Sequence, residues 1–108
     1  MVLVPFLFVG APVVIILLAL PLIFGMVPRN RWYGFRSSKA RHSDEMWYRA
    51  NRLGGTYQAV AGLIELIGLG VIAVAVGDPS QAAWWALGDV LVPFFIAIIL
   101  WRIHMRRY

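Results

Sequence analysis

Three polar side chains interrupt long apolar stretches of this sequence, and they are the first candidates for chemistry. Gln58 and Glu65 lie within one apolar stretch and Asp89 within the next. An ionisable residue inside a membrane span is costly, so it marks a proton or ligand path or a hydrogen bond between helices. No lysine or arginine lies at a comparable depth. We expect Glu65 to be protonated or hydrogen-bonded at neutral pH. A packing contact is the favoured interpretation and a proton or ligand site the alternative.

The other reactive residue types form no recognisable catalytic or metal-binding pattern. Cysteine is absent, and the two histidines, His42 and His104, are far apart in the sequence. Zinc sites use closely spaced sets of cysteine, histidine and carboxylate ligands, which are not seen here. No phosphate loop, nucleotide fingerprint or nucleophile elbow is present either. We therefore expect neither an enzyme nor a cofactor or metal site.

The apolar content of the chain points to a membrane protein. Apolar and aromatic residues make up 61% of the sequence and charged residues 14%, against about a quarter charged in soluble domains. About 20 apolar residues suffice for a helix to cross a bilayer. We expect spans at about residues 2–27, 56–76 and 82–101. The fold class is thus an all-α membrane protein with three transmembrane helices in a single domain, residues 1–108.

Details within the spans lead to further expectations. The first span lacks the basic start and cleavage site of a signal peptide, so we interpret it as a retained helix. Kinks are expected near its Pro12 and Pro21. Residues 77–81 are rich in turn formers and would join the second and third spans by a compact turn.

Basic residues are distributed unevenly about these spans, which predicts the orientation. The loop at 28–55 and the C-terminal tail hold every lysine and arginine, and the turn at 77–81 holds none. The positive-inside rule places this loop and the C-terminus in the cytoplasm and the N-terminus outside. Interfacial tryptophans are expected at the outer surface (Trp84, Trp85) and the inner surface (Trp32, Trp101). The same rule accounts for the net charge of +5, so we expect no direct nucleic-acid binding.

The end of the loop carries the signals of a helix start. Ser43 can cap free N–H groups, and the acidic pair that follows suits the positive end of a helix dipole. We expect a short juxtamembrane helix from Asp44, which could run straight into the second span. One face of this helix would be small and polar: Trp47, Asn51, Gly54, Gln58, Ala61, Gly62, Glu65 and Gly68. Such a face packs against protein rather than lipid.

The loop resembles the signature of the SdpI family of bacterial membrane proteins. The similarity lies in the segment 30–37, in Ser43 with its acidic pair and Trp47, and in the glycine-bearing segment 50–55. The corresponding motif residues are Asn30, Gly34, Arg36, Ser43, Trp47, Asn51 and Gly54. The resemblance implies a multi-pass protein of the bacterial cytoplasmic (inner) membrane. It also implies a role like that of a family member that confers immunity to a secreted peptide toxin and holds a repressor at the membrane.

The motif residues have two possible roles. Asn30 and Arg36 could hydrogen-bond the loop to helix ends and carbonyls, Trp47 could anchor it at the interface, and Gly34 would permit a turn. Alternatively, these residues only shape the loop and bind nothing. Loops of this kind often carry function as well.

Three functions remain open at this stage. The first is toxin immunity or membrane signalling, with the basic loop recruiting a cytoplasmic regulator and the spans meeting lipid or a peptide toxin. The second is an accessory or structural subunit of a larger membrane complex, such as a respiratory assembly, with other membrane subunits covering the small, polar helix face. The third, ranked last, is a proton-coupled transporter built from several copies that uses Glu65 and Asp89.

Overall fold

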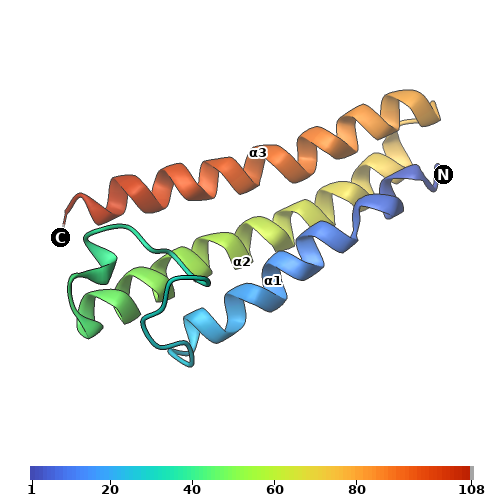
Figure 1. The fold of residues 1–108 in the computed structure, drawn as a ribbon. Helices are drawn as coiled ribbons and strands as arrows, with labels where there is room; N and C mark the ends of the chain where they lie inside the picture. The colour runs from blue at the N-terminus through green and yellow to red at the C-terminus, as the bar shows by residue number, and fades with distance from the viewer. Residues whose placement is uncertain (108) are drawn as a thin grey trace.

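The computed structural model describes residues 1–107, and every regular element in them is helical (Figure 1). A 3-10 helix, η1 (Val4–Phe8), leads into α1 (Gly10–Ile23). After a loop with a short 3-10 helix, η2 (Ala40–His42), come α2 (Asp44–Ala75) and α3 (Pro79–Met105). Three helical segments, with η1 and α1 taken together, are long and apolar enough to cross a membrane. The predicted all-α, three-span fold is confirmed.

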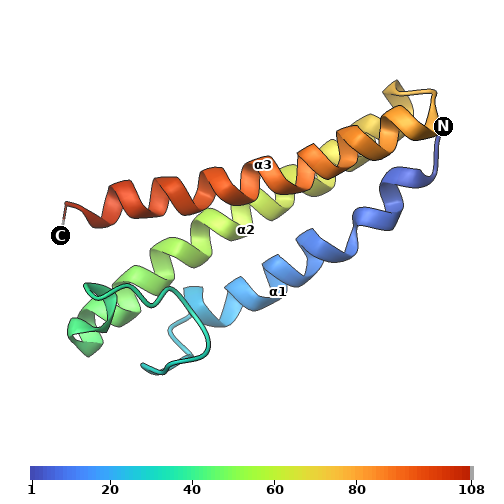
Figure 2. The same ribbon diagram turned by 45° about the horizontal axis from the view of Figure 1, so that its top comes forward.

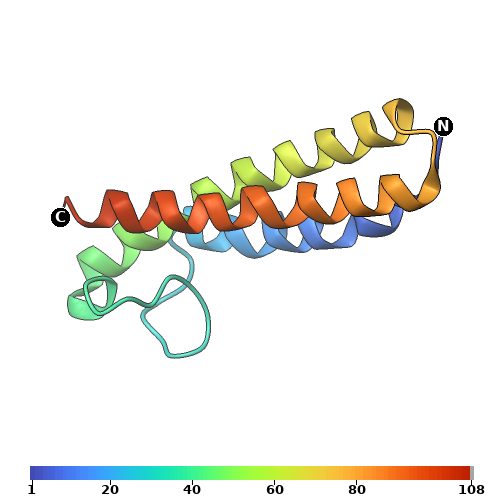
Figure 3. The same ribbon diagram turned by 90° about the horizontal axis from the view of Figure 1, so that it is seen from above.

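α2 is the central helix of the bundle, because both α1 and α3 pack against it. The views in Figures 1 and 2 place the N-terminus beside the α2–α3 connection. The loop between α1 and α2 lies at the opposite end with the end of α3, and Figure 3 gives the same arrangement from above. These two ends are called the turn end and the loop end below. All ten lysines and arginines belong to segments at the loop end.

The first span differs from expectation in having a break near its start. We predicted one helix over residues 2–27, but η1 gives way to α1 at Val9. Pro12 explains the change, because it has no N–H to bond the carbonyl four residues earlier. The second proline, Pro21, lies within the last turn of α1, and the helix ends two residues later.

The second span begins earlier than predicted and absorbs the juxtamembrane helix. The Ser43 hydroxyl accepts a hydrogen bond from the Met46 N–H at 3.1 Å, so the predicted N-cap is confirmed. From Asp44 the helix runs without interruption through the two glycines at 54–55. At 1.5 Å per residue it is about 48 Å long, which exceeds the ~30 Å hydrocarbon core of a bilayer. One stretch of α2 must therefore lie outside that core.

The connection between α2 and α3 is shorter than the predicted turn at 77–81. Asp78 caps α3 by accepting a hydrogen bond from the Gln81 N–H at 2.9 Å, and Pro79 occupies the first turn. An acidic cap followed by proline is a helix-start signal, and here it takes precedence over the turn propensity of the same residues. α3 also extends beyond the predicted end at residue 101, as far as Met105.

Close approach of the helices depends on the small residues of α2. A Cβ at Gly55 would lie 3.0 Å from the Ala19 carbonyl oxygen, and one at Gly62 would lie 2.6 Å from the Ile16 side chain. The predicted small face is thus covered by the chain's own helices. Large apolar side chains on the opposite face, such as Ile67, are exposed, as expected of a surface in contact with lipid.

The four tryptophans for which interfacial positions are predicted differ in burial. Trp84 and Trp85 near the turn end and Trp32 at the loop end are exposed. Trp101 is only 6% exposed, and its indole N–H donates to the Ala50 carbonyl at 2.9 Å. Trp101 is thus a contact between α3 and α2, and its depth in the membrane stays a prediction.

Candidate functional site: the motif loop

Asn51 is the residue that joins the loop to α2. Its side chain is buried, and its amide oxygen accepts a hydrogen bond from the Phe35 N–H at 2.6 Å. The amide nitrogen donates to the carbonyls of Trp47 (2.9 Å) and Phe35 (3.4 Å). One side chain thus satisfies both backbone groups of a loop residue that would otherwise lie unpaired against the helix.

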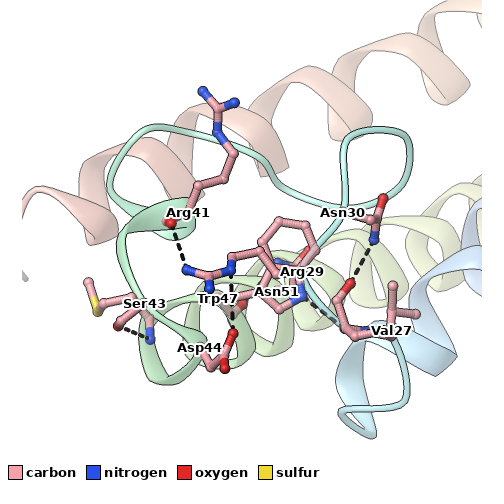
Figure 4. Close-up of polar contacts among 10 residues, drawn as sticks. Val27, Arg29, Asn30, Arg41, Ser43, Asp44, Trp47 and Asn51 are labelled. Carbon is pink, nitrogen blue, oxygen red and sulfur yellow. Dashed lines mark hydrogen bonds and ion pairs between the residues drawn. The ribbon is translucent and has the colours of Figure 1, made fainter.

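Trp47 holds the start of the loop (Figure 4). The side chain is fully buried, and its indole N–H donates to the Val27 carbonyl at 2.8 Å. The residue therefore anchors the loop through a contact inside the protein, because the loop folds back over the first turn of α2 and encloses the indole.

Replacing Trp47 with phenylalanine is expected to loosen the start of the loop. The substitution leaves the buried Val27 carbonyl without its donor, which costs about 1–3 kcal/mol. Trypsin cleavage after Arg29 should become faster in mild detergent, and the midpoint of thermal unfolding should fall. Trp32→Phe is the matched control, because Trp32 is 87% exposed. Equal effects of the two substitutions would contradict this account of the anchor.

Asn30 organises the first turn of the loop. Its amide oxygen accepts hydrogen bonds from the N–H groups of Trp32 and Tyr33, each at 2.8 Å, and its nitrogen donates to the Pro28 carbonyl at 2.8 Å. This is the local side-chain to backbone pattern that favours asparagine in turns. One of these bonds reaches a carbonyl, that of Pro28, and none of them reaches a helix end.

Gly34 and Gly54 make room for the loop on the helix. Gly34 has a φ of +114°, which confirms the predicted turn, and a Cβ there would lie 2.5 Å from the Asn51 amide oxygen. A Cβ on Gly54 would lie 2.5 Å from the Phe35 ring. That ring in turn packs on Trp101, with 4.9 Å between centroids. The two motif glycines thus allow Phe35 to fit between α2 and α3.

Basic side chains at the loop end make hydrogen bonds of two kinds, one within the loop and one to the ends of helices. The Arg36 guanidinium donates to the Arg31 carbonyl within the loop, so it does not reach a helix end as proposed. Helix ends are bonded instead by residues the sequence analysis did not single out. Arg52 donates to the Ile23 carbonyl at the end of α1 (3.2 Å), and Lys39 donates to the Met105 carbonyl at the end of α3 (2.8 Å). Cations at helix C-termini also interact favourably with the helix dipole.

Other contacts were also missed from the sequence. The Tyr33 hydroxyl donates to the Leu18 carbonyl of α1. Burial raises the pKa of the Tyr33 phenol above its ordinary value, so the hydroxyl keeps its proton at neutral pH. The Tyr57 hydroxyl and the His104 ring nitrogen lie 3.0 Å apart between α2 and α3. The only signal for these contacts was the presence of polar aromatic residues near the loop end.

The intramembrane polar residues lie apart from the motif loop. The Gln58 amide nitrogen donates to the Phe94 carbonyl at 3.2 Å, which makes it a link between α2 and α3. Glu65 is fully buried, and neither of its carboxyl oxygens has a hydrogen-bond partner among the described residues. The Asp89 carboxyl packs directly against Gly68 of α2. The expected packing hydrogen bond therefore exists for Gln58, whereas Glu65 makes none within residues 1–107.

The motif residues together fold the loop against α2. Four motif residues bring the loop onto α2: Gly34, Trp47, Asn51 and Gly54. Asn30 shapes the first turn of the loop, and Ser43 starts the helix. Arg36 stays at the surface. Within residues 1–107, no group of three or more histidine, cysteine or acidic side chains could hold a metal ion.

Comparison with known proteins identifies the family. The model of the SdpI/YfhL protein family matches residues 26–103, which include the whole motif loop, α2 and most of α3. No curated protein and no solved structure matches the chain. The matched region covers most of the sequence and every residue of the signature described above. This chain belongs to the SdpI/YfhL protein family.

Proposed function

We propose that this protein acts in the bacterial inner membrane in resistance to a membrane-active peptide toxin, or in signalling its presence, as the SdpI resemblance implies. The loop end would face the cytoplasm, because every lysine and arginine belongs to it. The N-terminus would then lie outside and the C-terminus inside. The spans would meet the toxin, and the basic loop would recruit a cytoplasmic regulator.

The main support is the construction of the loop. Residues 24–43 form a connection far longer than the ~2–8 residues that usually join two packed helices. Long loops of ordered structure are commonly functional. Here Asn51 and Trp47 of α2 hold the loop by hydrogen bonds to its backbone. Three arginines of the loop remain exposed: Arg31, Arg36 and Arg41. A fixed loop that presents several arginines is well suited to bind an acidic surface on a regulator.

A survival assay tests this proposal. The gene would be expressed in a bacterium sensitive to the peptide toxin that the family's immunity protein counters, with an empty vector as reference. Higher survival on toxin, together with toxin-dependent retention of a DNA-binding repressor in the membrane fraction, supports the proposal. Asn51→Ala should abolish both effects, because it releases the loop. Unchanged survival and an unchanged repressor distribution at equal membrane expression would refute it.

An accessory subunit of a larger complex is the second candidate. Its original motivation was the small, polar face of α2, together with acids that lacked partners. That face is covered by α1 and α3, and Glu65 is fully buried, so neither is open to another subunit. Affinity purification in mild detergent separates the two ideas: a stoichiometric set of membrane subunits would favour the accessory role.

A further inference from the structure

A second feature of the loop end is a cavity between the loop and α3. Its volume is about 780 Å³, within the size range of small-molecule sites. Three arginines of the loop, Arg31, Arg36 and Arg41, line it together with Arg102 of α3. Segments far apart in the sequence therefore contribute four arginines to the lining of one cavity.

No carboxylate among the described residues balances these charges. The acids nearest in sequence are paired elsewhere, since Asp44 lies 3.4 Å from Arg29 and Glu45 lies 3.4 Å from Arg49. No acidic residue lines the cavity. The Arg41 side chain extends away from the Arg29–Asp44 pair (Figure 4), and only its carbonyl accepts a hydrogen bond from Arg29. The cavity thus concentrates positive charge that the chain itself does not neutralise.

The rest of the cavity is polar on one side and apolar on the other. Ser37 and the arginines supply the polar lining, and Phe35, Ile98 and Trp101 form the apolar wall. This wall lies where α3 leaves its apolar stretch, as Arg102 directly follows Trp101. A guanidinium group binds phosphate oxygens in a bidentate manner, while an apolar wall suits the glycerol and first methylenes of a lipid. The chemistry fits an amphiphile with an anionic phosphate.

We propose that this cavity binds a phosphate-bearing anion, and that the source is the phosphodiester headgroup of an anionic phospholipid in the same leaflet. Basic pockets between transmembrane helices at the membrane surface bind anionic headgroups in this way. The four arginines hold the phosphate, and the acyl chains follow the exposed side of α3. Arg31, Arg36 and Arg41 are also the residues proposed to bind a regulator, but the lipid site does not rest on that function, since it requires only the geometry of the loop end.

The test compares two double variants that remove equal charge. Arg41→Gln/Arg102→Gln removes two cavity arginines, neither of which has a side-chain hydrogen bond or ion pair described above. Arg106→Gln/Arg107→Gln removes two arginines from the adjacent tail, outside the cavity. Each protein would be reconstituted into nanodiscs containing equal parts of phosphatidylglycerol and phosphatidylethanolamine. After release of the protein from the nanodisc, the molecules of each lipid that stay bound would be counted by native mass spectrometry.

The wild type and the tail variant should retain phosphatidylglycerol in preference to phosphatidylethanolamine. In the cavity variant the ratio of retained phosphatidylglycerol to phosphatidylethanolamine should be about tenfold lower. Equal retention by the two variants would overturn the proposal. A second arm adds inorganic phosphate to protein that still carries retained phosphatidylglycerol. Displacement of this lipid only at phosphate concentrations far above physiological ones supports the lipid as the source. Displacement at low millimolar phosphate would overturn the lipid assignment.

Discussion

Replacing Gly34 with alanine should release the loop from α2 and give the largest loss of stability of any single glycine substitution in the loop. The φ of +114° alone disfavours a side chain by about 1–3 kcal/mol. The added Cβ would also lie 2.5 Å from the Asn51 amide oxygen and 3.3 Å from the Trp47 ring. Relief of that contact must move Asn51, which breaks its hydrogen bonds to Phe35. We expect a lower midpoint of thermal unfolding and rapid trypsin cleavage of the loop in mild detergent.

Two further glycines serve as controls for Gly34. Gly25 has a φ of +67°, but its Cβ would approach no atom closer than 3.7 Å, so Gly25→Ala measures the backbone cost alone. Gly88 lies in α3 with open space around it, so Gly88→Ala should be neutral or slightly stabilising. If Gly34→Ala proved no worse than Gly25→Ala, the close contact with Asn51 would not be what holds the loop.

Replacing Glu65 with leucine should raise stability. Both carboxyl oxygens are buried without hydrogen-bond partners in the described part of the chain, and each such group costs about 1–3 kcal/mol. Leucine has a similar volume and removes the two unsatisfied atoms. The midpoint of thermal unfolding in mild detergent should therefore rise by several degrees, with Glu65→Gln intermediate.

Glu45→Gln is the control for charge removal, since the Glu45 side chain is 82% exposed and should contribute less than about 0.5 kcal/mol. Lower stability of Glu65→Leu would show that the carboxyl gains more from an interaction in the membrane than it loses by burial. If Glu65→Leu also lowered the proton flux into liposomes relative to the wild type, the two results together would favour the proton-coupled role.

The spans and the helix start were predictable because their signals are local. Apolar length identified the three spans, and Ser43 with its acidic pair identified the start of α2. The helical period also placed Asn51 on the buried face. Its partner Phe35 could not be found in the same way, since the path of an irregular loop has no period. The contact between Lys39 and Met105 cannot be predicted from a local pattern either, because the two residues are 66 positions apart in the sequence.

The burial of two tryptophans has a common physical origin. We expected Trp101 at the interface and Trp47 to anchor the loop there, because tryptophan favours that position. In each case a backbone carbonyl of the chain, at Ala50 and at Val27, accepts the indole N–H, and the side chain is buried within the protein. The general preference of tryptophan for the interface does not predict such a specific acceptor.

The bonds from the loop to the ends of α1 and α3 also determine when the loop can fold. Ribosomes deliver α1, the loop and α2 to the membrane before α3 exists, and domains assemble in that order. The carbonyl that accepts from Lys39 and the indole that donates to Ala50 both belong to the last turns of α3. The loop can reach its final shape only once α3 has been inserted. An arginine-rich surface that depends on this shape is therefore absent from partly synthesised chains. Any partner that binds this surface would bind only completed bundles.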